Sequence, residues 1–267
     1  MLILALDTTT RAGSMALMRD DRLLTADTGD PGRTHGERLP GDIVQLLSRH
    51  DVPLSAIDLY AVAAGPGSFT GLRIGIATMQ GLAMANGKGL VGVSALDALA
   101  LAAQAQINGS TLRPFDVRPE PSRKPNAQDG PFEPRTRDSE TEVIAVWMDA
   151  QRREVFAALY GAGDLTCLDG PLAVAPEDLQ SRWQRWLERS QVYFVGDGAL
   201  AYGTTISRAV TMTLIDPTPL MAPAVAALAA REAARGRVYG PELVRPLYVR
   251  RPDAELARDR RNVRVDR

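Results

Sequence analysis

Cysteine and histidine are nearly absent from this sequence of 267 residues, which has one cysteine, Cys167, and two histidines, His35 and His50. A single cysteine cannot close a disulfide within the chain, and these three residues leave little material for a Cys/His metal site. The histidines lie at opposite ends of one predicted helix, so we expect both to be surface or capping residues, with no metal ion shared between them. The low cysteine content also favours a reducing compartment.

Long apolar runs are missing as well. Arg231, Glu232 and Arg235 interrupt the alanine-rich segment 222–235, and no stretch reaches the roughly 18 apolar residues that cross a bilayer. The apolar start at residues 1–6 has no basic stretch before it and no small-residue cleavage site after it, so it resembles a first strand more than a secretion signal. We therefore expect a soluble, cytoplasmic protein.

Neither sign of charge is in excess. The chain has 31 Lys and Arg against 32 Asp and Glu, a formal net charge of −1. This balance excludes nucleic-acid binding through a global positive field, so any RNA contact must be local. Eight arginines gather in residues 245–267, a tail that fits either a solvated chain end or a contact with RNA or a protein partner.

The first 107 residues alternate apolar runs of strand length with segments of helical periodicity, which is typical of an α/β lobe. Thr34 and Glu37 have the spacing of a capping box, and a glycine-rich loop follows the fourth predicted strand. We expect strands at 2–6, 14–18, 22–26, 59–64 and 90–93, and helices at 35–49, 72–86 and 96–105.

The composition changes between residues 108 and 142, where six prolines fall between Pro114 and Pro134 and large aliphatic residues nearly vanish. This pattern predicts a disordered linker or insertion. The second half then partly repeats the first, with a hairpin at 143–148 and 154–160, a helix at 180–189, a strand at 192–195 and a helix at 222–235. The predicted domains are a first lobe (1–107), the insertion (108–142), a second lobe (143–235) whose last helix can return to the first lobe, and a basic tail (236–267).

Two motifs could face an anion or a nucleotide. Asp7 ends the first predicted strand and is followed by Thr8, Thr9 and Thr10. At such a turn an acidic side chain can hold a metal-bound water while the backbone N–H groups face phosphate. The same residues also fit an ordinary end of a strand. The string GPGSFTGLRIG, residues 65–75, can form an anion cradle at a helix N-terminus or only a tight strand-to-helix turn. The candidates in that loop are Gly65, Gly67, Ser68, Thr70 and Gly71.

Several segments occur in one order along the chain: the hairpin start, GPGSFTGLRIG, TMQGLA (78–83), VWMDAQRREVF (146–156), FVGDGAL (194–200) and PLYVRRPDAE (246–255). In these segments the chain closely resembles the TsaB/YeaZ family, over about residues 1–105 and again after the insertion. The resemblance implies an α/β fold of the ASKHA (actin/Hsp70-like) type, with two RNase-H-like lobes whose mixed sheets are flanked by helices.

The resemblance also implies a function. Members of this family act as the non-catalytic subunit of the bacterial complex that forms threonylcarbamoyladenosine in tRNA, where they bind and activate the transferase TsaD and recruit the ATPase TsaE. It implies no cofactor held by this chain itself, ATP and ADP being used by the complex. It further implies that tRNA is contacted indirectly through the complex. Separately, an apolar stripe on helix 71–86 that a lone chain would tend to cover makes a homodimer of the free chain possible.

The catalytic relatives of this family carry an Asn-His-x-x-x-His segment that holds the active-site metal. The matching segment here begins Ser94-Ala95-Leu96-Asp97-Ala98-Leu99, with Ala95 and Leu99 in place of the two histidines. Neither side chain can coordinate a cation. We therefore expect no catalytic and no metal-binding residues.

In the family the contact with TsaD resembles a bundle made from the first two helices of each partner. Carried over to this chain, these helices are 35–49 and 71–86, and the second is the main candidate for the partner surface. The candidate contact residues are Leu39, Ile43, Leu46, Leu72, Ile76 and Met79, although each helix has one wide apolar stripe that can instead face the chain's own sheet.

Two other functions remain alternatives. A stand-alone nucleotide-binding enzyme of the kinase-like ASKHA type would need Asp7 and the glycine loop to hold nucleotide, and a catalytic base that the sequence does not reveal. A metallopeptidase-like protein would need the histidines that Ala95 and Leu99 replace.

The missing histidine pair leads to a direct prediction. Purified protein without partners should hold no stoichiometric zinc, iron or magnesium, because its metal-ligand positions carry hydrocarbon side chains. Elemental analysis after gel filtration measures this, and about one tightly held metal ion per chain would contradict it.

Overall fold

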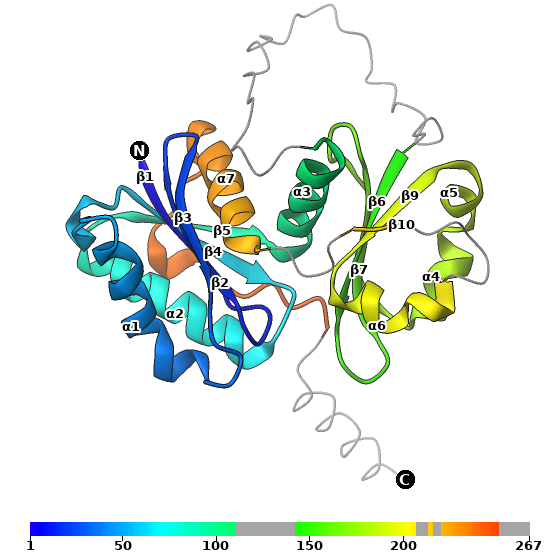
Figure 1. Cartoon of the computed structure of the whole chain (residues 1–267), viewed down its shortest axis with the longest axis horizontal. Helices are drawn as coiled ribbons and strands as arrows, with labels where there is room; N and C mark the ends of the chain where they lie inside the picture. Colours follow the sequence, from blue (N-terminus) through cyan, green and yellow to red (C-terminus); the bar gives the residue numbers. More distant parts are fainter. Residues whose placement is uncertain (110–141, 207–212, 216–219, 251–267) are drawn as a thin grey trace, which may run out of the picture.

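A computed structural model describes residues 1–109, 142–206, 213–215 and 220–250. Residues 110–141 of the predicted insertion and residues 251–267 of the predicted tail lie outside these ranges. The described chain forms two α/β lobes, each built on a five-stranded mixed sheet (Figure 1). The predicted fold class is therefore confirmed.

The sheet of the first lobe has the strand order β3-β2-β1-β4-β5. β1, β2 and β3 are antiparallel neighbours, whereas β4 and β5 run parallel to β1. Along β1 the odd and even side chains enter two different hydrophobic cores, so both faces of the sheet need cover. The strands are β1 (Leu2–Asp7), β2 (Ser14–Arg19), β3 (Arg22–Thr28), β4 (Leu59–Gly65) and β5 (Gly89–Ser94).

Two helix pairs supply that cover. α1 (His35–Ser48) and α2 (Phe69–Ala85) pack on the outer face, while α3 (Ala95–Ile107) and α7 (Met221–Ala234) lie on the inner face, between the two sheets (Figure 1). The predicted start of α1 is confirmed, because the Glu37 carboxylate accepts hydrogen bonds from the Thr34 backbone N–H (2.9 Å) and hydroxyl (2.8 Å). The short 3₁₀ helix η1 (Leu54–Ala56) leads into β4.

The second lobe repeats the same plan. Its sheet has the order β10-β9-β6-β7-β8, in which β6 is antiparallel to β7 and parallel to β9. Trp147, Trp183 and Phe194 form the aromatic centre of its outer core. Its elements are β6 (Glu142–Asp149), β7 (Val155–Gly161), β8 (Cys167–Val174), α4 (Pro176–Arg182), α5 (Gln184–Arg189), β9 (Gln191–Val195), α6 (Asp197–Ile206) and β10 (Thr213–Leu214).

Three features of the second lobe differ from the sequence prediction. The helix expected at 180–189 is two short helices that meet at Trp183, whose side chain is fully buried. β8 was not predicted, because Asp169, Gly170 and Pro171 are poor strand formers. α6 was also missed, since Gly196 and Gly198 flank its first residue and read as a turn.

α7 follows the second lobe in sequence but packs on the first. Its alanines at 222, 224, 226 and 229 are fully buried against β1, β2 and α3, which explains why small side chains fill this helix. The Ala222 backbone N–H donates to the Ser14 hydroxyl at 3.0 Å, which anchors the start of the helix to β2. No helix in the described ranges is both long and apolar enough to span a membrane.

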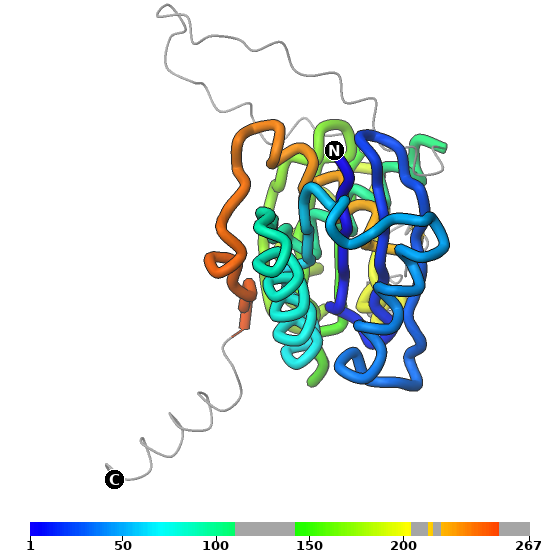
Figure 2. Tube along the Cα trace, turned by 90° about the vertical axis from the view of Figure 1, so that its left-hand side faces the viewer, coloured from blue at the N-terminus to red at the C-terminus, as the bar shows by residue number. Residues whose placement is uncertain are grey.

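After α7 the chain returns along the first lobe as a strap, residues 237–250, which includes the 3₁₀ helix η2 (Pro241–Leu243). The Leu90 N–H donates to the Tyr239 carbonyl (3.2 Å), and the Leu247 N–H donates to the Ala64 carbonyl (2.7 Å). Gln80 of α2 donates to the carbonyls of Pro241 and Val244. Figure 2 shows the orange strap beside the cyan helix α2.

The six residues proposed as partner contacts are corrected by the structure. All of them are nearly inaccessible, from 0% exposed for Leu46 and Met79 to 4% for Ile43. Five of them pack with the side chains of β1 and β4 in the outer core of the first lobe. The apolar stripes of α1 and α2 therefore cover the chain's own sheet, and only Ile43 also borders an open surface. The six are Leu39, Ile43, Leu46, Leu72, Ile76 and Met79.

Ile76 provides a test of this assignment. A glutamate at Ile76, which is 3% exposed, would bury an unpaired charge and cost several kcal/mol of a total stability of about 5–15 kcal/mol. We expect Ile76→Glu to lose the cooperative unfolding transition of the free chain, measured by circular dichroism. A variant that melts like the wild type would show that this face of α2 is not core.

Candidate functional site

The carboxyl end of β1 leads into a tight polar turn that faces the second lobe. The Asp7 carboxylate is 2% exposed and accepts hydrogen bonds from the Thr9 N–H (2.9 Å) and hydroxyl (2.6 Å). The Thr10 hydroxyl accepts one from the Gly13 N–H at 3.1 Å, which closes the turn before β2. Asp7 is thus held in one orientation by its own turn.

The glycine-rich loop packs directly against this turn. The Ser68 N–H donates to the Thr9 carbonyl at 2.8 Å, and the Ser68 hydroxyl accepts from the Gly71 N–H at 3.3 Å. A Cβ at Gly71 would overlap the Thr8 carbonyl oxygen, and one at Gly75 would overlap the Thr8 hydroxyl. The glycines therefore let α2 approach the backbone of the turn, as the packing alternative for this loop requires.

A cavity of about 380 Å³ lies between the lobes at this turn. Asp7 lines it from the first lobe and Asp197 from the second, where the Asp197 carboxylate accepts from the Asp149 N–H at 2.8 Å. Of the residues predicted to face an anion, Asp7 alone is in the lining; Gly65, Gly67, Ser68, Thr70 and Gly71 are not.

The pKa values of both carboxylates in this cavity are raised. Burial raises the pKa of Asp7, and repulsion from Asp197 raises it further, against the opposing effect of the Thr9 hydrogen bonds. Burial likewise raises the pKa of Asp197. Asp197 was missed by the sequence analysis, because only the arrangement of the two lobes brings it opposite Asp7.

The segment that would carry metal-binding histidines sits beside this cavity. Ala95 is fully buried and Leu99 is 3% exposed, with Leu99 in the cavity lining next to Met148 and Met221. Within the described ranges, no three His, Cys, Asp or Glu side chains come close enough together to hold a metal ion. Leu99 thus contributes hydrocarbon to the cavity wall at one of the two positions where the resemblance implies a metal-binding histidine in the catalytic relatives.

His35 and Arg38 link α1 to the same turn. Of the two expectations for His35, surface or capping, the surface one is wrong, because His35 is buried at the first residue of α1. Arg38 reaches both the Ala12 carbonyl and His35 Nδ1 (2.9 Å), and it forms an ion pair with Asp42 (2.7 Å). A guanidinium only donates, so Nδ1 accepts and Nε2–H donates to the Thr10 carbonyl at 3.0 Å. Burial lowers the pKa of His35, which favours this neutral tautomer.

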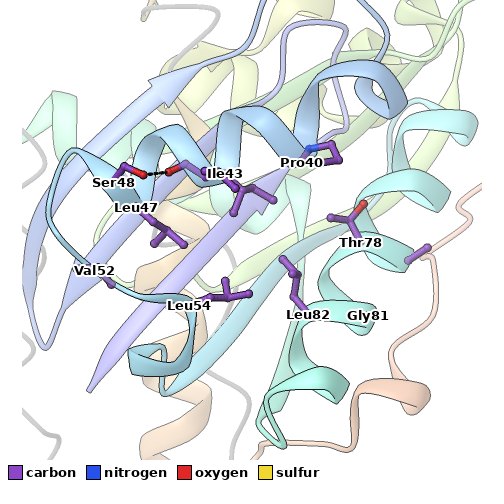
Figure 3. Close-up of a pocket in the computed structure, with 11 residues that line it drawn as sticks. Pro40, Ile43, Leu47, Ser48, Val52, Leu54, Thr78, Gly81 and Leu82 are labelled. Atoms are coloured by element: carbon purple, nitrogen blue, oxygen red, sulfur yellow. Dashed lines mark hydrogen bonds between the residues drawn. The ribbon is translucent and has the colours of Figure 1, made fainter.

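A second cavity is an apolar groove between α1 and α2, with a volume of about 500 Å³ (Figure 3). Ile43, Leu47, Leu54 and Leu82 contribute aliphatic side chains to it, and Val44, 64% exposed, lies at its edge. We call this surface the α1–α2 groove. Its full lining is Pro40, Ile43, Val44, Leu47, Ser48, Val52, Leu54, Ala77, Thr78, Gly81 and Leu82.

Comparisons with known proteins point to one family. The family model described as "TsaD: tRNA N6-adenosine threonylcarbamoyltransferase" matches residues 30–117. The tRNA threonylcarbamoyladenosine biosynthesis protein TsaB of Escherichia coli is 40% identical over 120 residues, 44% of this chain and 51% of that protein. TsaB of Haemophilus influenzae is 38% identical over 102 residues, 38% of this chain and 42% of that protein. The matched region thus spans about half the length of these curated relatives.

The solved structure of YeaZ from Pseudomonas aeruginosa covers 92% of this chain and 99% of its own, with a TM-score of 0.69 and 27% identity. The repeated sheet order and the cavity between two lobes define an actin-like protein of the ASKHA class. Within that class, the chain is similar in sequence and in structure to the proteins of the TsaB/YeaZ family.

The buried carboxylate of Asp7 predicts a pH-dependent effect. Its folded-state pKa lies above its unfolded value, so ionisation destabilises the fold above the folded pKa, and this cost disappears as the pH falls towards the unfolded value. Asp7→Asn keeps the oxygen that accepts from Thr9 and removes the charge. We expect a higher melting temperature than wild type at pH 7 to 8.

The difference should shrink as the pH is lowered towards about 4, the unfolded pKa of an aspartate. Melting curves at a series of pH values measure it. Destabilisation by Asp7→Asn at neutral pH, or a difference that does not change with pH, would contradict the assignment.

Proposed function

We propose that this chain is the non-catalytic subunit of a bacterial complex that forms threonylcarbamoyladenosine in tRNA. In this role it binds and activates a TsaD-type transferase and recruits a TsaE-type ATPase, and the complex, rather than this chain, uses ATP. Similarity to the TsaB/YeaZ proteins is the observation that carries the proposal, because the E. coli and H. influenzae relatives are described as biosynthesis proteins for this nucleoside.

The composition of the interlobe cavity supports a non-catalytic role. A metal-dependent transferase of this fold needs ligands on the first turns of α3, and the chain has Ala95 and Leu99 there. Asp7 and Asp197 are two carboxylates without a third protein ligand nearby in the described residues. The same cavity is therefore a poor match for the metallopeptidase-like alternative. It is a poor match for the kinase-like alternative as well, because the glycine loop that would hold nucleotide is not in its lining.

The α1–α2 groove is the proposed docking surface for the TsaD-type partner. The TsaD family model matches residues 30–117, which include both helices, so the partner carries an equivalent helix pair. Two like pairs can pack with their apolar faces together and form a four-helix contact. A second copy of this chain carries the same groove, which accounts for the proposed homodimer of the free protein.

Reconstitution tests the proposed function. A TsaD-type transferase, a TsaE-type ATPase, ATP, threonylcarbamoyladenylate and unmodified tRNA should yield the modified nucleoside only when this chain is added. The chain alone should neither hydrolyse ATP nor cleave peptides. Product formation without the chain, or ATP turnover by the chain alone, would contradict the proposal.

The docking surface leads to a separate prediction. Val44→Glu places a charge at the edge of the groove on a side chain that is already 64% exposed, so the free chain should fold normally. In the complex that charge is desolvated, and we expect the affinity for the TsaD-type partner to fall on the order of tenfold or more in calorimetric titration.

Leu200→Glu is the matched control, because Leu200 is an equally exposed aliphatic residue (60%) on α6 of the second lobe. This control should bind like the wild type. Equal affinities for Val44→Glu and wild type, with both folded, would remove the groove from the interface.

A further inference from the structure

An exposed cluster of aromatic and arginine side chains joins the strap to the start of α2. Phe69 and Tyr248 stack with ring centroids 5.2 Å apart, and both remain about two-fifths exposed. The Arg73 guanidinium lies over the Phe69 ring at 3.8 Å, and its Nε donates to the Tyr248 hydroxyl at 3.1 Å. The rings and the cation are therefore held in place before any ligand arrives.

Two of the three arginines of this cluster, Arg73 and Arg245, are not neutralised by a carboxylate in the part of the chain that the structure describes. Among the described residues, Arg73 forms no ion pair with a carboxylate, and the contacts of Arg245 are to the backbone carbonyls of Glu242 and Val244. Arg250 continues the series along the strap and reaches Glu154 of the second lobe at 2.6 Å. We call Phe69, Arg73, Arg245, Tyr248 and Arg250 the arginine–aromatic stripe.

A cavity of about 400 Å³ opens beside the Tyr248 ring, between the lobes. Its walls include Leu96, Pro171 and Val249, and its polar groups include the exposed Asp97 carboxylate and the Tyr160 hydroxyl. Tyr160 donates to Asp97 Oδ1 at 2.6 Å, and burial raises its pKa, so it stays a donor. Asp97 Oδ2 is left to accept a hydrogen bond from an amino group.

We propose that the arginine–aromatic stripe and this cavity bind a single-stranded loop of RNA. An unstacked base lies on the Tyr248 ring with its edge towards Asp97, while the arginines contact the flanking phosphates. Proteins commonly bind single-stranded RNA by three means: a base stacks on an exposed ring, a fixed polar group recognises the edge of the base, and arginine contacts the phosphates. The identification of that RNA as a tRNA loop rests on the proposed function.

The position of the stripe fits a role beside the docked partner. Phe69, Arg73 and Gln80 lie on the side of α2 that meets the strap, whereas Thr78, Gly81 and Leu82 line the α1–α2 groove. The two surfaces use different residues of one helix. Because the whole chain has a net charge of −1, such a local cluster is the means by which it can attract RNA.

Fluorescence anisotropy tests the proposal with the full chain, alone and bound to its TsaD-type partner. The probes are a labelled tRNA anticodon stem-loop and a duplex of the same stem without the loop. Tyr248→Ala should weaken binding of the stem-loop about tenfold, as expected for the loss of one stacking ring, and Tyr248→Phe should retain most of the affinity. Binding of the duplex should be weaker and insensitive to Tyr248.

Arg73→Ala should lower the slope of log affinity against log salt by about 0.7, the contribution of one phosphate contact to a single strand. Arg185→Ala is the matched control, because Arg185 lies over Trp186 at the same distance of 3.8 Å, on α5 of the second lobe. It should change neither affinity nor slope. Melting curves confirm that each variant is folded.

Unchanged stem-loop affinity in Tyr248→Ala and Arg73→Ala, or no binding by the wild type in either form, overturns the proposal. The proposal is also overturned if these two variants lose affinity for the TsaD-type partner but keep their affinity for RNA, because the stripe would then be a protein interface. These results can be told apart from a failure of the proposed function. In that case the wild-type chain would add nothing to nucleoside formation in the reconstitution, whereas the anisotropy titration measures RNA affinity independently.

Discussion

The close contact between the β1–β2 turn and the glycines of α2 is the constraint on which the rest of the first lobe depends. Gly71 and Gly75 bring α2 against the backbone and side chain of Thr8, and Ser68 bonds to Thr9. From that contact α2 runs back along the sheet beside α1, so its direction sets the α1–α2 groove. The turn therefore connects the cavity that contains Asp7 and Asp197 on one side with the proposed docking surface on the other.

The cavity at the β1–β2 turn combines two carboxylates with an apolar wall. Asp7 and Asp197 keep two carboxylates facing one cavity, a costly placement that fold stability alone does not explain, while Leu99 and Met148 line its wall. His35 and Arg38 tie the first turn of α1 to the same β1–β2 turn. A partner that shifts α1 would therefore act on the cavity of this chain through one short chain of hydrogen bonds.

Patterns along the chain predicted most of the fold, because apolar periodicity and caps are local. The hairpin start, the capping box of Thr34 and Glu37, and the helix after GPGSFTG all appear as expected. Of the six proposed contact residues, all but Ile43 lie outside the groove for a physical reason: the apolar stripe of each helix packs on the sheet beneath it. The groove instead depends on the angle between two helices, and the approach of Asp7 to Asp197 depends on how the two lobes are placed. Neither the angle nor the placement is encoded in the local spacing of residues.

In the proposed role, this chain works by docking through α1 and α2 rather than by chemistry in its cavity. Hydrogen–deuterium exchange of the full chain, alone and with a saturating TsaD-type partner, tests it most directly. We expect the largest slowing of exchange in α1 and α2, at residues that border the groove. Slowing confined to the interlobe turns at residues 7–13 and 196–198, with α1 and α2 unchanged, would contradict it.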